Sequence, residues 1–334
     1  MSQIKTCVSL YSLQYEYLYK RMTLEDIFRF LSDNGVDGVE VLPDQMIKGS
    51  PEPDDREIEN WRNLCEKYSI KPVISDVFCN TNLYNNRTLT KKECVKLLEK
   101  EIILAHKLGM NLVRFVSFTP AFVLEPLLPV CEKYNVRVAD EIHAGLGFDM
   151  PKTREFIDEM RRLNSPYIGL VIDTGIFCKK NPRVMENYCL NMGTNPKLVD
   201  IVHGFYEKGK DGRAIRDEKG SFIPEVLEIA KTGPDFMFAN FADGYENTPL
   251  SVLDEYMPNI FHFHFKLFEM TDNGEYSMDY KEILQYLHDK GYDGYVSTEY
   301  EGNRWTLPGL PTTEKEQVLL HQKFIKKCVR EIEG

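Results

Sequence analysis

Long apolar segments are missing from this sequence. No run of apolar residues among its 334 residues approaches ~18 in length, the extent that predicts a membrane-spanning helix. The start of the chain, MSQIKTCVSLYS, also lacks the apolar stretch of a secretion signal. We therefore expect a cytoplasmic protein without a membrane partner.

Positive charge is also in short supply. Lys and Arg together number 41 against 52 Asp and Glu, which gives a net charge of −11 and a pI of about 5.3. Binding to a nucleic-acid duplex requires a basic surface that neutralises phosphates. The acidic balance therefore argues against a nucleic-acid partner and is typical of a soluble globular protein.

Cysteine pairs with the spacing of a metal or redox motif are absent. The eight cysteines stand at positions 7, 65, 79, 94, 131, 178, 189 and 328, and no two of them form a C-x-x-C pair. This spacing indicates neither a zinc knuckle nor a dithiol redox motif. Cys94 and Cys328 fall in apolar or helical surroundings, where a buried free thiol is the expected state.

Short β-branched segments are present instead, and they alternate with amphipathic helical patterns. Thr23 precedes one such pattern as a possible N-cap, and Gly35 follows it as a stop. Thr90 and Glu93 predict a capping box for a helix that ends near Gly109. The eight candidate strands are Thr6–Tyr11, Val36–Leu42, Pro72–Phe78, Asn111–Phe118, Val136–His143, Ile168–Thr174, Ile260–Lys266 and Tyr295–Tyr300.

Eight strands joined by helical crossovers predict a parallel sheet that closes into a (β/α)8 barrel, the TIM barrel fold. The alternative, a doubly wound sheet, usually carries a glycine-rich phosphate turn after its first strand. The corresponding stretch here, SLYSLQYEYLY, contains no glycine. Since no linker or low-complexity tract divides the chain, we predict a single barrel domain over residues 1–334.

One segment breaks the alternation. Residues 177–258 separate the sixth and seventh candidate strands and are far more numerous than one crossover needs. We interpret them as a long insertion between strands 6 and 7, with a strand-like piece at Phe236–Phe241. In a barrel, such an insertion lies over the mouth of the active site or contacts a partner.

The last four candidate strands end in residues that bind metals. These strands read VRVADEIHAG, GLVIDTG, IFHFHFK and YVSTEYEG, and the second of them closes with Asp173. Catalytic groups of a barrel come from the C-terminal ends of its strands. Because alternate strand residues share a side, three pairs are predicted to point together: Glu141 with His143, His262 with His264, and Glu299 with Glu301.

Carboxylates from three strands and one imidazole would form a ligand set of three oxygens and one nitrogen. Such a set suits Mn2+, Mg2+, Co2+ or Zn2+ and leaves positions open for substrate oxygens. Each residue also has a structural interpretation: Asp173 as a helix cap, His262 as a core histidine, and the two glutamates of STEYEG as a solvated face. Buried unpaired acids are costly, so four such strand ends together favour a metal site.

Three motifs carry a family resemblance. GVDGVEVL, HFHFK and GYDGYVSTEYEG, together with the order Glu, Asp, His, Glu on the last four strands, resemble the xylose isomerase-like superfamily of sugar isomerases, epimerases and endonucleases. The resemblance covers nearly the whole chain. It implies that the metal ligands are Glu141, Asp173, His264 and Glu299, because the family's ligand histidine stands two residues before the lysine.

The Glu141-Ile142-His143 sequence resembles the catalytic alpha subunit of C-glycoside deglycosidases. That resemblance implies a carbon–carbon lyase that acts with Mn2+ on 3-oxo-C-glucosides of flavonoid or phenolic aglycones. His143 would remove the C2 proton as general base, and the metal-stabilised enediolate would expel the aromatic carbon by β-elimination. The resemblance also implies a small beta subunit as partner, bound beside the barrel mouth.

Other functions of the same superfamily remain open to different degrees. A metal-dependent sugar or sugar-phosphate isomerase or epimerase is the main alternative, although the ketose 3-epimerases place a histidine where this chain has Ile176. Abasic-site endonucleases resemble one another in a three-zinc cluster, which needs many ligands. This chain has only seven histidines, and its acidic charge does not suit binding to DNA. A third possibility is a binding or scaffold barrel without catalysis, in which the four acidic and imidazole groups would not bind a metal.

Several further residues are candidates for substrate contacts. We predict that Arg114, Lys266 and Glu301 bind the substrate, with Asp76 as a weaker candidate. Arg114 and Asp76 each also suit an ion pair. Aromatic residues that would wall an aglycone site, or only pack in the core, are Tyr11, Tyr15, Tyr17 and Phe118.

Overall fold

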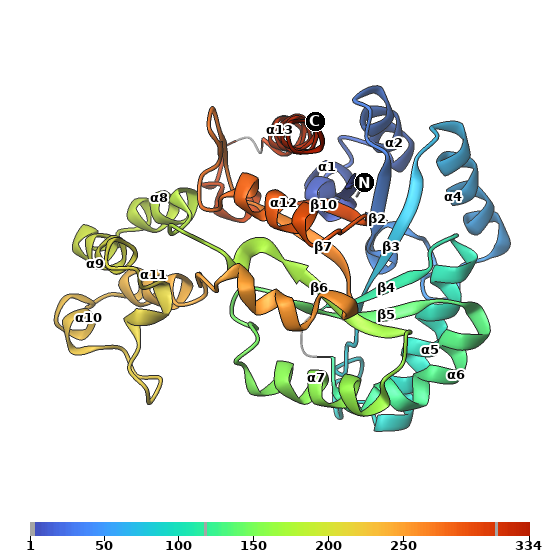
Figure 1. The fold of residues 1–334 in the computed structure, drawn as a ribbon, viewed down its shortest axis with the longest axis horizontal. Coiled ribbons are helices and arrows are strands. Elements are labelled where there is room, and N and C mark those ends of the chain that lie inside the picture. Colours follow the sequence, from blue (N-terminus) through green and yellow to red (C-terminus); the bar gives the residue numbers. More distant parts are fainter. Residues whose placement is uncertain (1–3, 117–118, 311–312) are drawn as a thin grey trace.

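A closed barrel of eight parallel strands forms the centre of the protein (Figure 1). The computed structural model describes residues 4–116, 119–310 and 313–334. Neighbouring strands follow the order β1-β2-β3-β4-β5-β6-β7-β10 and close back onto β1. Their bounds are β1 Lys5–Ser9, β2 Gly38–Val41, β3 Lys71–Phe78, β4 Leu112–Val116, β5 Arg137–Ile142, β6 Ile168–Asp173, β7 Ile260–Leu267 and β10 Tyr295–Tyr300.

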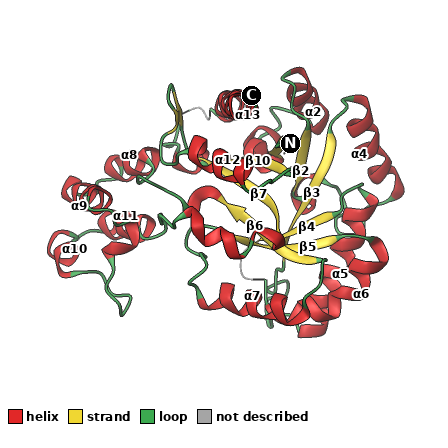
Figure 2. Cartoon of the chain, viewed as in Figure 1, coloured by secondary structure: helices red, strands yellow, loops and turns green. Residues whose placement is uncertain are grey.

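The predicted TIM barrel and its eight strands are therefore confirmed. The end of the fourth predicted strand, at Phe118, lies outside the described residues. Helices surround the barrel (Figure 2), and a two-stranded hairpin of β8 Met270–Thr271 and β9 Gly274–Glu275 follows β7. The helices are α1 Gln14–Leu18, α2 Leu24–Asp33, α3 Pro43–Met46, α4 Asp55–Lys67, α5 Lys91–Lys107, α6 Leu124–Tyr134, α7 Pro151–Leu163, α8 Arg183–Asn191, α9 Pro196–Glu207, α10 Pro224–Ile229, α11 Gly233–Ala242, α12 Tyr280–Asp289 and α13 Glu314–Glu333.

The helix starts follow local capping chemistry. The Thr23 side chain accepts a hydrogen bond from the Asp26 backbone N–H, and Thr90 does the same with Glu93. In both cases the acidic side chain bonds back to the cap residue, which completes a capping box. Both predicted caps are thus confirmed.

Between β6 and β7 the chain passes through α8, α9, α10 and α11, which lie together to one side of the barrel in Figure 1. The predicted strand at Phe236–Phe241 is wrong, because these residues belong to helix α11. The aromatic run favours a strand by propensity. The capping box of Thr232 and Asp235 starts a helix instead, which buries Phe238 and Ala242 on one face.

The barrel interior is divided into an apolar layer and a charged layer. An apolar cluster includes Ile74, Leu112, Ala139 and Val171, all buried. Two residues further along the same strands come charged residues, and alternation keeps each on the same side of its strand. These charged residues are Asp76, Arg114, Glu141 and Asp173.

Neither a disulfide bond nor a membrane-spanning helix is found among the described residues. All eight cysteines are free, and Cys94 and Cys328 are buried as predicted. Within the described residues, none of the helices has both the length and the apolar character needed to cross a bilayer.

A buried histidine makes the fold sensitive to acid. His321 of α13 is fully buried; its Nδ1 lies 2.7 Å from Oγ1 of Thr298, and its ring packs edge-on against Tyr280. Burial lowers the pKa of His321 to about 3. In the unfolded chain this histidine takes up a proton near pH 6.5, whereas in the folded chain it stays neutral until about pH 3. The free energy of unfolding therefore falls as the pH drops from about 6.5 toward 3.

We expect His321→Asn to flatten this acid dependence by up to about 1.4 kcal/mol per pH unit below pH 6.5. The free energy of unfolding, measured by urea titration at several pH values, gives the slope. His106→Asn, at an exposed position of α5, is the matched control and should keep the wild-type slope. Parallel curves for wild type and His321→Asn would contradict the assignment.

Candidate metal and active site

Four neighbouring strands bring the predicted metal ligands together. Strands β5, β6, β7 and β10 stand side by side in the barrel and carry Glu141, Asp173, His264 and Glu299. Asp173 pairs in register with His264. The ligand atoms of Glu141, His264 and Glu299 all lie within 4.8 Å of one another. The structure thus gathers three of the predicted ligands in one cluster, with Asp173 beside it.

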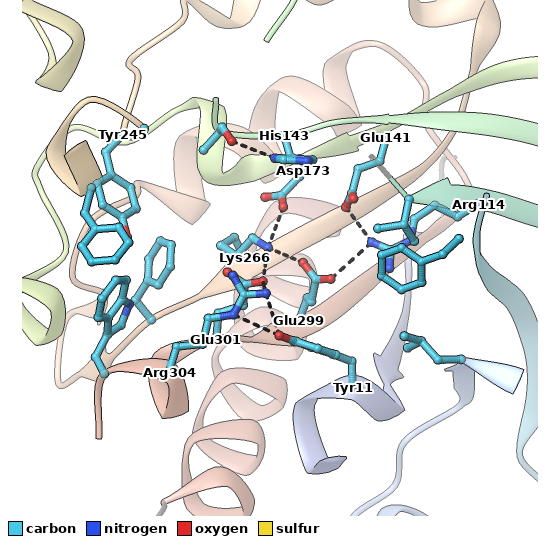
Figure 3. A pocket seen from close by; sticks show the side chains of 18 of the residues that line it. Tyr11, Arg114, Glu141, His143, Asp173, Tyr245, Lys266, Glu299, Glu301 and Arg304 are labelled. Carbon is cyan, nitrogen blue, oxygen red and sulfur yellow. Dashed lines mark hydrogen bonds and ion pairs between the residues drawn. The ribbon is translucent and has the colours of Figure 1, made fainter. Parts of the chain in front are cut away.

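Two buried cations lie against these carboxylates (Figure 3). Nη1 of Arg114 is 2.6 Å from Oε1 of Glu141 and 3.2 Å from Oε1 of Glu299. Nζ of Lys266 is 2.8 Å from Oδ2 of Asp173 and 2.5 Å from Oε2 of Glu299. Arg114 and Lys266, predicted as substrate contacts, therefore hold the carboxylates at close spacing.

The pKa values of the three carboxylates depend on these contacts and on burial. Burial alone would raise the pKa of Glu141, but the Arg114 guanidinium lowers it to about 2. The pKa of Glu299 is likewise held well below its ordinary value, because Lys266 and His264 outweigh its desolvation. Burial raises the pKa of Asp173 to about 6, against the opposing effect of Lys266.

Asp173 also caps the turn that follows its strand. Its Oδ1 accepts a hydrogen bond of 2.7 Å from the Gly175 backbone N–H. One carboxylate oxygen therefore caps the turn, as the structural interpretation of Asp173 expected, and the other faces Lys266. The cap fixes the side chain in a single direction.

Glu40 of β2 supports the ligand histidine from below and was not predicted. It is fully buried, with Oε2 2.9 Å from Nε2 of His264 and Oε1 2.6 Å from Nε2 of His262. Desolvation opposes the charge on Glu40, yet the two imidazoles keep its pKa below the ordinary value. The only sequence signal was an acid inside the apolar run GVEVL. His262 is buried against this carboxylate.

The contacts of His264 test whether a cation fits. Since Nε2 lies 2.9 Å from the Glu40 carboxylate, Nδ1 is the ring nitrogen that faces the site. Nδ1 lies 2.8 Å from the Arg114 Nη1 donor and 3.0 Å from the Glu141 carboxylate. Three lone-pair donors thus converge on one region, with a carboxylate behind the imidazole, which is the usual surrounding of a metal-bound histidine. The residues fit a divalent cation.

His143 stands beside this cluster, just beyond the end of β5 (Figure 3). Its Nδ1 lies 2.7 Å from the carbonyl oxygen of Ala144, which can only accept. In the neutral ring Nδ1 therefore carries the hydrogen, and Nε2 is the basic nitrogen. His143 is partly buried and lines the same cavity as Glu141 and Asp173.

A second group of charges lies at the mouth. Glu301 accepts from Lys266 at 3.2 Å and from Arg304 at 2.7 Å, and Arg304 also donates to the Tyr11 hydroxyl at 2.6 Å. Figure 3 shows this chain of contacts. Arg304 was not predicted, because it lies in the loop after the last strand. Asp76 accepts from Arg114 Nε at 2.8 Å, behind the site.

A cavity of about 630 Å3 opens above these residues, within the range of sites for small organic ligands. It is lined by every predicted site residue except His264 and the weaker candidate Asp76, both of which are buried. Of the predicted aromatic wall Tyr11 lines it, Tyr15 and Tyr17 do not, and Phe118 lies outside the described residues. Aromatic residues after β6, β7 and β10 line it instead: Tyr188, Phe241, Tyr245, Phe268 and Trp305.

Comparison with known proteins agrees with this architecture. The chain is 29% identical over 309 residues to a C-glycoside deglycosidase alpha subunit of Arthrobacter globiformis, across 89% of this chain and 84% of that protein. It is 23% identical to the 3'-dehydrocarminate deglycosidase alpha subunit of a Microbacterium species, across 98% and 96% of the two chains.

Solved structures share the fold. A 3-keto-D-glucoside 4-epimerase from E. coli superposes with a TM-score of 0.56 at 10% identity, over 98% of this chain and 100% of that chain. The IolI protein with a bound zinc atom gives 0.55 at 15% identity, over 98% and 99%. The model of the family described as xylose isomerase-like TIM barrel matches residues 28–328. The chain therefore belongs to the xylose isomerase-like TIM barrel family.

Proposed function

We propose that this protein is the catalytic alpha subunit of a divalent-metal-dependent C-glycoside deglycosidase. Its substrates are 3-oxo-C-glucosides of flavonoid or phenolic aglycones, and the reaction is a carbon–carbon lyase step. The observation that carries the proposal is the position of His143 beside the cluster of Glu141, His264 and Glu299 in one cavity. Similarity to deglycosidase alpha subunits over most of the chain supports it.

Glu141, Asp173, His264 and Glu299 would hold the metal, with Mn2+ the expected ion and Mg2+, Co2+ or Zn2+ as possible replacements. When bound, the ion supplies Lewis-acid polarisation of the sugar carbonyl, which makes the neighbouring C–H acidic. Arg114 and Lys266 keep the carboxylates ionised through the contacts described above. They are also placed to bind substrate oxygens, together with Glu301.

His143 acts as the general base. Its Nε2 takes the proton from C2 of the 3-oxo sugar, and the Ala144 carbonyl keeps the other ring proton on Nδ1. The electron pair of the C2–H bond forms a C1–C2 double bond as the bond from C1 to the aromatic carbon breaks. The aromatic carbon takes up a proton, so no water or oxidant is consumed. A two-carboxylate hydrolysis does not suit this bond, which has no leaving oxygen to protonate.

A partner subunit follows from the same proposal. The similar proteins are named alpha subunits, and we infer a small beta subunit that binds beside the barrel mouth. The remaining alternative is a sugar or sugar-phosphate isomerase or epimerase on the same metal. Ile176, which stands where ketose 3-epimerases place a histidine, is buried and does not line the cavity, which favours the deglycosidase.

Metal binding is the first prediction of this proposal. We expect Mn2+ at 100 times its Kd to stabilise the folded protein by about 2.7 kcal/mol. Glu299→Gln should weaken Mn2+ binding by at least about 10-fold, since it removes a ligand charge. Isothermal titration after chelator treatment measures the affinity. Glu218→Gln, at an exposed site after β6, is the matched control. Equal affinities in the two variants would refute the ligand assignment.

Proton abstraction is the second prediction. With Mn2+ in heavy water, the wild-type protein should introduce deuterium at C2 of a 3-oxo-C-glucoside, detected by NMR. His143→Ala should slow this exchange by about 10^2- to 10^4-fold, the usual contribution of a general base. His203→Ala, on α9, should behave as wild type.

Exchange itself does not require release of the aglycone, so a missing beta subunit leaves the signal intact. Exchange on free ketoses alone, unaffected by His143→Ala, would favour the epimerase instead. No exchange on either substrate, with no metal bound, would refute the active-site assignment.

A further inference from the structure

One end of the cavity is apolar, in contrast to its charged floor. Tyr188 comes from α8, Met237 and Phe241 from α11, and Trp305 from the turn Gly302–Trp305 that follows β10. We call these four residues, three aromatic and one methionine, the aromatic face. All are partly exposed, and Phe241 is 38% exposed although it is a large apolar side chain. Leaving such surface in water forgoes burial energy, so exposed apolar groups inside a cavity mark a ligand contact.

The indole of Trp305 is held in a fixed orientation. The ring of Phe241 meets it edge-on at a centroid distance of 4.8 Å and an angle of 79°. The ring of Tyr188 meets it at 5.8 Å and 62°. Behind them Tyr245 packs edge-on against Phe268 at 5.5 Å. Because these contacts order the rings in advance, a planar ligand would lose little extra entropy on binding there.

A polar atom within the aromatic face lacks a partner. The indole Nε1 of Trp305 is buried and makes no hydrogen bond to any of the described residues. A buried donor without a partner costs about 1–3 kcal/mol. Because this atom is enclosed, it does not offer a hydrogen bond to the cavity, and the aromatic face presents its apolar ring surfaces instead. A second sugar ring carries many hydroxyl groups, and the side chains of Met237 and Phe241 cannot hydrogen-bond to them.

The division of the cavity suggests how a two-part substrate would lie. The charged groups around Glu299 and Lys266 suit a sugar's oxygens, whereas the aromatic face suits a flat apolar ring. At about 630 Å3 the cavity is larger than a single sugar ring fills. Both halves belong to one continuous cavity, so the sugar and a ring attached to it can be bound at once.

We infer that Tyr188, Met237, Phe241 and Trp305 form a subsite for a planar aromatic ring. The identification of this ring with the aglycone rests on the proposed function. The subsite itself rests on the pre-ordered aromatic face and on its place in the same cavity as the charged groups.

Tryptophan fluorescence tests the subsite directly. The chain contains two tryptophans, and the other, Trp61, is buried in α4, where its Nε1 donates to the Leu108 carbonyl at 3.1 Å. In the Trp61→Phe variant Trp305 is therefore the sole reporter. We expect phloroglucinol to quench its emission saturably, whereas myo-inositol leaves it unchanged. Neither ligand requires turnover or metal.

Variants locate the binding. Trp305→Phe, which keeps Trp61, should lose the quenching, so the test does not depend on the folding of the Trp61→Phe variant. In the wild-type background Phe241→Leu should weaken phloroglucinol binding roughly 2- to 12-fold, as expected for loss of an aromatic contact. Phe222→Leu, in the same segment but outside the cavity lining, is the matched control.

Each outcome is decisive for one of the two proposals. Absence of saturable quenching, equal quenching by myo-inositol, or an equal effect of Phe222→Leu would overturn the subsite. Saturable phenol binding without proton exchange on a 3-oxo-C-glucoside would leave the subsite standing and count against the deglycosidase function alone.

Discussion

The balance of charge inside the barrel is the constraint on which the site depends. Glu40, Glu141 and Glu299 are removed from water, and an isolated carboxylate in such surroundings costs many kcal/mol. Arg114 and Lys266 offset that cost for Glu141 and Glu299 through contacts of 2.5 to 3.2 Å, and His262 and His264 do so for Glu40. Removing one member of such a network leaves an uncompensated buried charge, which typically costs about 3–5 kcal/mol. The residues of the proposed site are therefore also structural residues.

This network orders the site in successive shells. The carboxylate of Glu40 lies against Nε2 of His264, so that Nδ1 faces Glu141 and Glu299. Lys266 connects Asp173 and Glu299 across two strands. Because each side chain is fixed by a neighbour that is itself buried, the ligand geometry is prepared before any ion or substrate binds.

Chemistry and substrate choice are carried by different parts of the chain. The proposed metal ligands and His143 stand at strand ends or directly after them, where the barrel fixes their positions. The aromatic face comes largely from α8 and α11, outside the repeating strand–helix pattern. Loops and added helices can change with little effect on the barrel, so substrate preference can vary while the reacting groups stay in place.

The sequence by itself determined the strands, the helix caps at Thr23 and Thr90 and the residues at the strand ends, because alternation and capping are local patterns. Locality also explains the error at Phe236–Phe241, where strand propensity conflicted with the cap at Thr232. Only the tertiary structure decided that Glu40 supports His264 and that Trp305 meets Phe241. Those residues are far apart in the chain, and their meeting depends on barrel closure and on how the helices between β6 and β7 pack, which no local pattern encodes.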